Sequence, residues 1–528
     1  MQLLTLAIIF FTGLIIFYYK LIYEVVRDRL RIYHYLRKFE GPLAFPLVGN
    51  LYMVNIFNIS QLTVKVMQLA VFYCNKGCGI VRLWVGPVPM LAVVNPAYAK
   101  EILESTEVIT KANEYDILFP WLGTGLLTST GKRFSKFSVF SVLSVFGKLC
   151  SWLIKLVSFK CYVVETNGAN VGKCSLRPFI SKCSTTSCVY MTIKQRLSIC
   201  VVVYTDVFFQ VFLEQLKPHA DSGKEVDLFP FIKRMALDII CETSMGASVN
   251  AQNNHDHPYV KSVHRLSEIA FLWIIYPWLK LKPLWYLTGY GSEYDRHLKV
   301  VTDFTKNVIE EKWEEYQQFQ LGTEKKDKRS MAFLDLLLQL RSEGLMNEED
   351  IREEVDTFMF EGEFSSNQRY YQGLVLSGHD TTAASIGWTL WCLAHNPEIQ
   401  EKVIEEVDRI FGTSDRDCTN EDLKQMKYLE KCLKESLRMF PSVPFFGRRV
   451  EKDTVISEFP PFAQSIFLLF HFQTKFAMME EKAVISWLFR KYRVTASKQF
   501  EENKILPELI MKSSLGFPLT VRHRMENK

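Results

Sequence analysis

The residues that could do chemistry form two short motifs in the second half of the chain. His379-Asp380-Thr381-Thr382 places a carboxyl group beside a hydroxyl group, and Glu435-Ser436-Leu437-Arg438 separates a carboxylate from a guanidinium by three positions. An acid next to an alcohol on a helix can orient water and relay a proton where bulk solvent is excluded. Residues three apart share a helix face and can form an ion pair. Taken alone, two adjacent threonines are often packing residues, and the Glu-Arg pair is an ordinary helix salt bridge.

The hydrophobic pattern predicts the helices that position these motifs. Asn396-Pro397 is typical of a helix start, and apolar residues then recur on one face until Gly412 ends the run. Thr419 is predicted to cap a second helix, which keeps its apolar spacing up to Phe440 and the helix breaker Pro441. Glu435 and Arg438 lie on this second helix.

Length and composition bound the fold and exclude one class of function. The 528 residues are 48% hydrophobic, enough to bury a large core in one or two domains. Residues 79–95, around Gly86-Pro87, read as a hairpin, but strands are a minority and we expect a mainly α fold. The 63 basic and 58 acidic residues form no basic block of the kind that a nucleic-acid interface needs. We therefore expect no nucleic acid among the partners.

The N-terminal segment has the pattern of a membrane anchor. Leu3 to Tyr19 contains no charged residue, and its length just reaches the minimum for a membrane-spanning helix. A basic stretch follows, so the positive-inside rule places the bulk of the chain in the cytosol. A cleaved signal peptide is the alternative, but no basic residue precedes the apolar run and no small-residue cleavage site follows it. We expect an anchor over 1–24 and a basic, proline-rich joint over 25–50.

The motifs together resemble the cytochrome P450 superfamily, and specifically its family 4. The resemblance includes Pro441-Ser442-Val443-Pro444 and the sequence through Arg448, Trp121 to Leu127, and Lys475 to Arg524. It covers roughly three quarters of the chain, a pattern with a low false-positive risk. The resemblance implies a cytochrome P450 fold with a small β-rich lobe over residues 51–528.

The resemblance also implies an activity. It is that of a haem-thiolate monooxygenase of the endoplasmic reticulum membrane, which takes electrons from NADPH-cytochrome P450 reductase. With O2 it would hydroxylate a lipophilic small molecule, fatty acid-like or xenobiotic. Asp380 and Thr381 would be the catalytic residues that manage proton delivery.

Further residues take binding or structural roles by the same resemblance. Glu435 and Arg438 would form a structural ion pair near the haem. Arg448 resembles the arginine that pairs with a haem propionate, the alternative being an exposed loop charge. Glu361 resembles the glutamate through which family 4 members often attach haem covalently, although an insert displaces it and brings Ser377 to that position.

Three segments depart from the family pattern, at about residues 135–210, 363–378 and 459–474. The cysteine loop that supplies the axial haem ligand should precede the helix beginning near Lys475, yet no cysteine follows Cys432 in the chain. Cys432 and His471 are poor substitutes, because Cys432 is placed by a helix and His471 lies in an apolar run without an orienting acceptor. The sequence therefore predicts no protein ligand for the metal.

The departures leave one rival reading of function open. The abrupt edges of these segments favour translated intron or mis-joined exon. As written, the chain could be a catalytically inactive, haem-free relic or a lipophile-binding protein. A second membrane span over residues 139–160 is excluded, because Lys148 and Lys155 interrupt the apolar run.

Overall fold

The computed structural model describes most of the chain outside its N-terminus and two long internal segments. Apart from isolated residues, the described ranges are 32–45, 48–53, 75–86, 88–105, 110–123, 208–254, 257–320, 333–344, 346–361, 378–443, 446–450, 454–456, 459–462, 466–469, 475–506 and 510–524. Most of the predicted anchor, most of segment 135–210, and the insert up to residue 377 lie outside these residues. No helix within the described ranges is both long and apolar enough to cross a bilayer.

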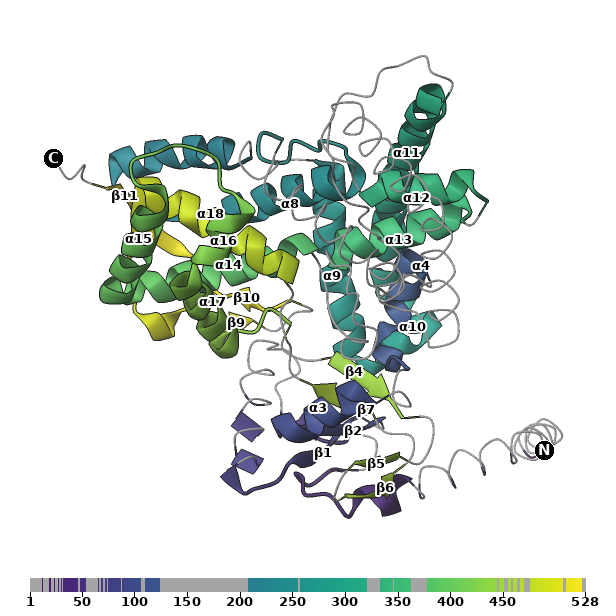
Figure 1. The fold of residues 1–528 in the computed structure, drawn as a ribbon. Helices are drawn as coiled ribbons and strands as arrows, with labels where there is room; N and C mark the ends of the chain where they lie inside the picture. The colour runs from purple at the N-terminus through teal and green to yellow at the C-terminus, as the bar shows by residue number, and fades with distance from the viewer. Residues whose placement is uncertain are drawn as a thin grey trace, which may run out of the picture. The chain divides into compact units, whose positions relative to one another are not determined.

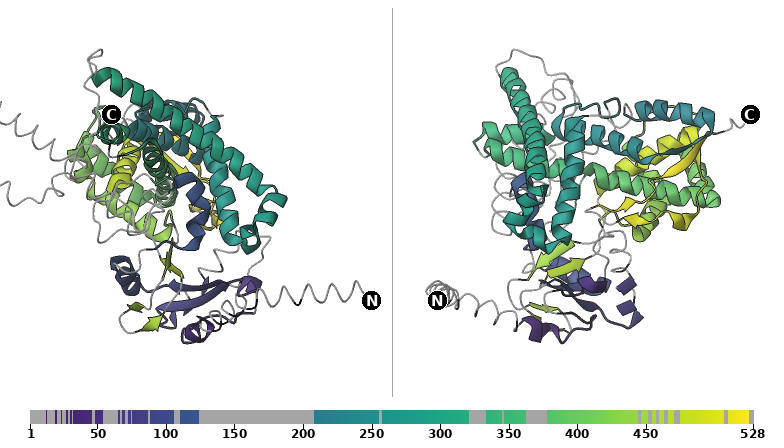
Figure 2. Two further views of the ribbon diagram at one scale, coloured as in Figure 1. Left: turned by 90° about the vertical axis from the view of Figure 1, so that its right-hand side faces the viewer. Right: turned by 180° about the vertical axis from the view of Figure 1, so that it is seen from behind.

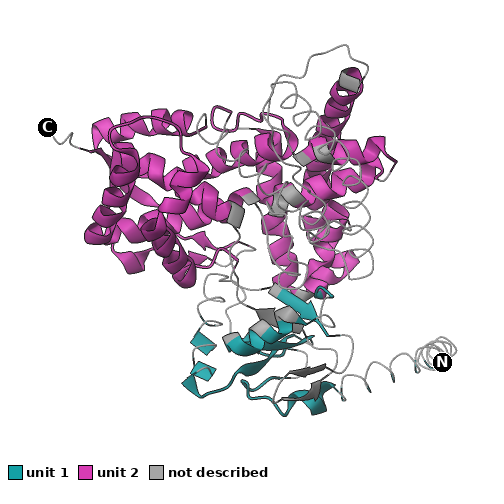
Figure 3. Ribbon diagram, in the orientation of Figure 1, with its two compact units in different colours: residues 1–112, 446–469 teal, residues 113–445, 470–528 magenta. Residues whose placement is uncertain are grey.

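The chain divides into two compact units, coloured separately in Figure 3. The first comprises residues 1–112 and 446–469, and the second comprises residues 113–445 and 470–528. The fold is mainly helical with small sheets, which confirms that part of the prediction.

The first unit is rich in strands. Its four-stranded sheet has the order β1 (Ile80–Val85), β2 (Val88–Val93), β7 (Ile466–Leu469) and β4 (Phe446–Arg449). Strands β1 and β2 form the predicted antiparallel hairpin, and Gly86 turns between them with a φ of 59°, a value that favours glycine. The unit also contains η1 (Leu51–Met53), α3 (Pro96–Glu104) and the β5–β6 pair (Thr454–Ile456 with Phe459–Phe462).

The second unit contains the long helices (Figure 1). Together with the shorter helices of this unit, the labelled ones are α4 (Phe119–Leu122), α8 (Phe229–Met245), α9 (Pro258–Ile275), α10 (Lys282–Leu287), α11 (Tyr290–Gln320), α12 (Phe333–Ser342), α13 (Glu348–Glu361), α14 (Gly378–His395), α15 (Pro397–Phe411), α16 (Asn420–Gln425), α17 (Lys427–Met439) and α18 (Lys475–Lys491). The shorter 3₁₀ segments are η2 (Asn113–Leu118), η3 (Pro277–Lys280) and η4 (Phe500–Glu502). Helices α9 and α11 pack against each other, as two further views show (Figure 2).

Two small antiparallel sheets complete this unit. Strand β11 (Pro518–His523) pairs with β3 (Glu225–Asp227) on one side and with β8 (Tyr492–Ala496) on the other. Strands β9 (Ile505–Leu506) and β10 (Lys512–Ser513) form a short hairpin. The segment just before α8 and the C-terminal strands therefore meet in one sheet.

Helix α14 is the central helix of the second unit. Every residue from His379 to Trp391 is buried, as expected for a helix covered on all sides. It contacts α8, α13, α17, α18 and β8. The indole of Trp388 stacks on Phe440, with ring centroids 4.0 Å apart, and meets the edge of Phe517 at 5.2 Å. These contacts fix α14 against the end of α17 and the start of β11.

The helix pair predicted on either side of Gly412 is present with two differences. Helix α15 has the predicted start, but the Asn396 side chain donates back to the Cys392 carbonyl, at 2.8 Å, and caps nothing. The second helix is not continuous: Thr419 caps the short α16, the backbone leaves the helical conformation at Met426, and α17 follows. The apolar spacing runs across this break, which is why the pattern predicted one helix.

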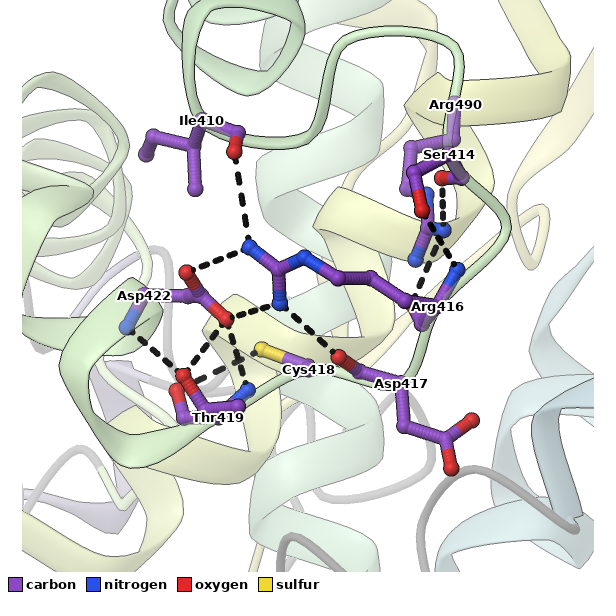
Figure 4. A network of polar contacts seen from close by, with 8 residues as sticks. All are labelled: Ile410, Ser414, Arg416, Asp417, Cys418, Thr419, Asp422 and Arg490. Carbon is purple, nitrogen blue, oxygen red and sulfur yellow. Dashed lines mark hydrogen bonds and ion pairs between the residues drawn. The ribbon is translucent and has the colours of Figure 1, made fainter.

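A polar network holds the loop between α15 and α16 (Figure 4). The Arg416 guanidinium donates to both carboxylate oxygens of Asp422, at 2.6 and 2.8 Å. The same carboxylate accepts from the backbone amide of Thr419, at 2.9 Å, while the Thr419 hydroxyl oxygen accepts from the Asp422 amide, at 3.3 Å, and these two bonds form the capping box of α16. Arg490 of α18 donates to the carbonyls of Ser414 and Arg416, at 2.5 and 2.9 Å. The network thus ties the loop to α18.

Candidate active site

Asp380 and Thr381 lie in the first turn of α14, inside the second unit. Both residues are buried, with 6% and 8% of their whole-residue surface exposed. The Ser442 hydroxyl, from the segment after α17, donates to the Thr381 carbonyl at 3.0 Å. Asp380 and Thr381 are therefore consecutive residues of a helix removed from bulk solvent, and their role in a proton relay stays a prediction.

The carboxylate of Asp380 has a cationic partner on a neighbouring helix. Lys233 Nζ, from α8, lies 2.8 Å from Asp380 Oδ1, and His379 Nε2 lies 3.4 Å from the same oxygen. Burial by itself raises the pKa of Asp380, but Lys233, His379 and His264 oppose it and bring the pKa below its ordinary value. Burial lowers the pKa of His379, against the raising effect of Asp380. At neutral pH the site therefore holds an anionic Asp380 beside a neutral imidazole.

Glu435 and Arg438 form the pair that their spacing indicates, but at a surface. Arg438 Nη2 and Nε lie 2.7 and 2.8 Å from the two carboxylate oxygens of Glu435, a bidentate contact on α17. The side chains are 58% and 69% exposed. The hydrogen bonds to Arg438 lower the pKa of Glu435. The sequence resemblance led us to expect a pair near the haem, whereas the pair is open to solvent here.

Arg448 and Glu361 lie on other elements. Arg448 is in β4 of the first unit, opposite Phe467 of β7, and is 2% exposed, so the alternative of an exposed loop charge is wrong. Its predicted role toward a propionate stays a prediction. Glu361 is the last residue of α13, and α14 begins only at Gly378. The two motifs on either side of the insert therefore lie on separate helices, which contact each other.

Comparison with known proteins decides the family. A sequence model described as Cytochrome P450 matches residues 201–365 and 371–461. Cytochrome P450 4V2 of Pongo abelii and of Homo sapiens are each 32% identical to the chain, over 91% of it and 89% of their own length. Cytochrome P450 4c3 of Drosophila melanogaster is 30% identical, over 96% of the chain and 93% of its own length. The chain belongs to the cytochrome P450 family.

Family membership implies haem as the cofactor, yet the cysteines that the structure describes in the second unit do not fit a haem-thiolate centre. The resemblance places the axial cysteine in a loop before α18, whereas Cys241, Cys392 and Cys432 lie within α8, α14 and α17. Burial raises the pKa of Cys392 and of Cys432 to about 11 each. Burial also raises the pKa of Cys241 well above its ordinary value. Cys418 is buried with its Sγ directed to the Thr419 carbonyl, at 3.8 Å.

The segment before α18, which the resemblance predicts to supply the axial cysteine, does not fit a haem-thiolate centre either. In the sequence, no cysteine lies between Cys432 and the C-terminus, so none immediately precedes α18. His471 lies outside the described residues. Asp380 and Thr381 both lie on α14, and their role in proton delivery stays a prediction, while the sequence places no cysteine just before α18.

The sequence reasoning missed the cations around Asp380. Lys233 is only 12% exposed, and it follows Phe231-Ile232 in an apolar helix start. A lysine is rarely buried unless it is paired, so its position in an apolar run was a usable signal. His264 and Lys512 gave no such signal, because both polar and apolar residues flank each of them in the sequence.

Proposed function

We propose that this P450 is a monooxygenase that hydroxylates a lipophilic substrate, fatty acid-like or xenobiotic, with O2 and electrons from NADPH. NADPH-cytochrome P450 reductase would be its electron donor. The buried acid-alcohol pair Asp380-Thr381 on α14 is the single observation that carries the proposal. The similarity to family 4 members over nine tenths of the chain supports it.

We also propose that the protein resides in the endoplasmic reticulum membrane, with residues 1–24 as a single-pass anchor and the catalytic domain in the cytosol. The uncharged run from Leu3 to Tyr19 and the basic residues after it support this placement. Anchoring beside the membrane would also give the site access to lipophilic substrates.

A second candidate function has its own observation. No cysteine follows Cys432 in the sequence, and Cys392 and Cys432 lie within helices α14 and α17, not in a loop before α18. These facts favour a haem-free relic, or a lipophile-binding protein, for the chain as written.

Two measurements separate the candidates. Sequencing the transcript across codons 130–215, 355–385 and 450–480 shows whether the cell makes the chain as written. The full chain, expressed in microsomes, is then reduced and exposed to carbon monoxide. A thiolate-type Soret band, with NADPH-dependent hydroxylation of a fatty acid when the reductase is added, supports the monooxygenase. A transcript that matches as written, with no such band and no product, supports the relic.

A further inference from the structure

A cluster of charged and titratable side chains surrounds Asp380 from three other elements of the second unit. Lys233 of α8 contacts its carboxylate at 2.8 Å. On α9, His264 is close enough to Lys233 and Asp380 for their charges to shift its pKa. Lys512 of β10 has its Nζ 3.0 Å from His264 Nε2. Glu268, one turn further along α9, lies 3.4 Å from His264 and 4.0 Å from Lys512.

The charges in this cluster are arranged so that each cation has a specific neighbour. Lys512 lies against His264 and Glu268, while Lys233 lies against Asp380. Burial, Lys233 and Lys512 together lower the pKa of His264 to about 4, against Asp380 and Glu268. His264 is therefore neutral at pH 7 and is suited to accept a hydrogen from the Lys512 ammonium. That leaves Lys233 as the full positive charge in direct contact with Asp380.

A buried carboxylate without such a contact would take up a proton. Removing an ion from water costs several kcal/mol per charge even after relaxation, and a carboxyl group escapes the cost by becoming neutral. The side chains of Lys233 and Asp380 are only 12% and 8% exposed, so water cannot replace the ammonium. The protonation state of Asp380 consequently depends on Lys233.

We propose that Lys233 is a positioning residue for the candidate active site, which keeps the Asp380 carboxylate a fixed anion directed at α8. Asp380 then serves as an oriented acceptor beside Thr381 and is not itself a reservoir of the proton to be delivered. The catalytic meaning of this assignment rests on the proposed monooxygenase function. The charge state does not, because it follows from contacts within the protein.

The test is a site-specific titration of Asp380 in the full chain without added haem. The chain is labelled with ¹³C at the aspartate carboxyl carbons, and the infrared carboxyl stretch is followed as the pH is lowered. Subtracting the spectrum of Asp380→Asn assigns the signal. Lys233→Met removes the charge, Lys233→Arg keeps it, and Lys224→Met is the matched control, since Lys224 is an exposed lysine just before β3.

The proposal expects Asp380 to remain ionised in the unmodified chain down to the lowest pH at which it stays folded. In Lys233→Met, the titration should move up by about two pH units, the shift that an adjacent cation typically produces. Lys233→Arg and Lys224→Met should follow the unmodified chain. The proposal is overturned if Asp380 titrates identically with and without Lys233, or titrates in its ordinary range in the unmodified chain.

A second measurement covers the case in which Lys233→Met does not fold. Urea unfolding is compared for the unmodified chain, Asp380→Asn and the double variant, and Lys233→Met is scored as fully destabilised if it does not fold. If the two side chains neutralise each other, the double variant should unfold nearer to the unmodified chain than Lys233→Met does. Losses that simply add would contradict the pairing. Both measurements use haem-free protein, so a failure of the monooxygenase proposal leaves their outcome unaffected.

Discussion

At the scale of single residues, exposure decides how much an ion pair contributes. Glu435 and Arg438 make a bidentate contact, but both side chains are mostly in water, where screening and side-chain entropy cancel most of the attraction. We expect Glu435→Ala to leave the urea midpoint of unfolding unchanged within error. A clear loss of stability would show that another part of the chain covers this pair in solution.

The buried pair Arg352–Asp356 should behave in the opposite way. Arg352 donates to Asp356 at 2.5 Å and to the Trp121 carbonyl at 2.8 Å, and Thr305 donates to the other carboxylate oxygen at 2.7 Å. Burial raises the pKa of Asp356 to about 7, against the lowering effect of Arg352. Arg352→Met leaves the buried Asp356 without its guanidinium partner, and should cost about 3–5 kcal/mol in urea unfolding.

A matched double variant tests the reason for that loss. Arg352→Met combined with Asp356→Asn removes the stranded charge, so part of the lost stability should return. An unchanged loss in the double variant would assign the effect of Arg352 to packing and to its contacts with Glu349 and the Trp121 carbonyl.

The sequence was enough to predict that the candidate site residues lie on a helix, but it did not reveal which residues contact them. The adjacency of Asp380 and Thr381 needs only the order of the residues, and α14 carries both as expected. The contact of Asp380 with Lys233 depends on how α8 packs on α14, which local patterns do not encode. The exposure of Glu435 and Arg438 likewise depends on what covers α17, and not on their spacing.

At the scale of elements, the break at Met426 has a tertiary cause. The Glu406 carboxylate, from α15, accepts hydrogen bonds from the backbone amides of Tyr428 and Leu429, at 2.9 to 3.0 Å. These amides belong to the first turn of α17 and have no partner within the helix. A side chain from another helix therefore supplies the cap of α17. The apolar spacing gives no sign of this contact, so it predicted a single helix.

Removing this cap should destabilise the second unit. Glu406 is 7% exposed, and its loss would leave two amides at the start of α17 unsatisfied. We expect Glu406→Ala to cost about 1–2 kcal/mol in urea unfolding, as loss of a helix cap does. Glu405→Ala is the control, because Glu405 is an exposed neighbour on the same helix. Equal effects of the two variants would contradict the capping role.

At the scale of the whole molecule, the N-terminal residues are predicted to hold the chain on a membrane. Deleting residues 1–24 should move the protein from the membrane pellet to the supernatant after carbonate extraction. Ile9→Arg combined with Ile15→Arg should do the same at unchanged length, because charges interrupt the apolar run. Retention of both variants in the pellet would show that another part of the chain binds the membrane.

The strand-rich unit has a consequence for the nascent chain. Strand β2 pairs in parallel with β7, and these strands come from opposite ends of the sequence. A ribosome adds roughly 5–20 residues per second, so the open edge of β2 waits on the order of tens of seconds for its partner. An unpaired strand edge is a template for aggregation during that time. Biogenesis of this protein should therefore depend on chaperones that shield the β1–β2 hairpin until translation has passed Leu469.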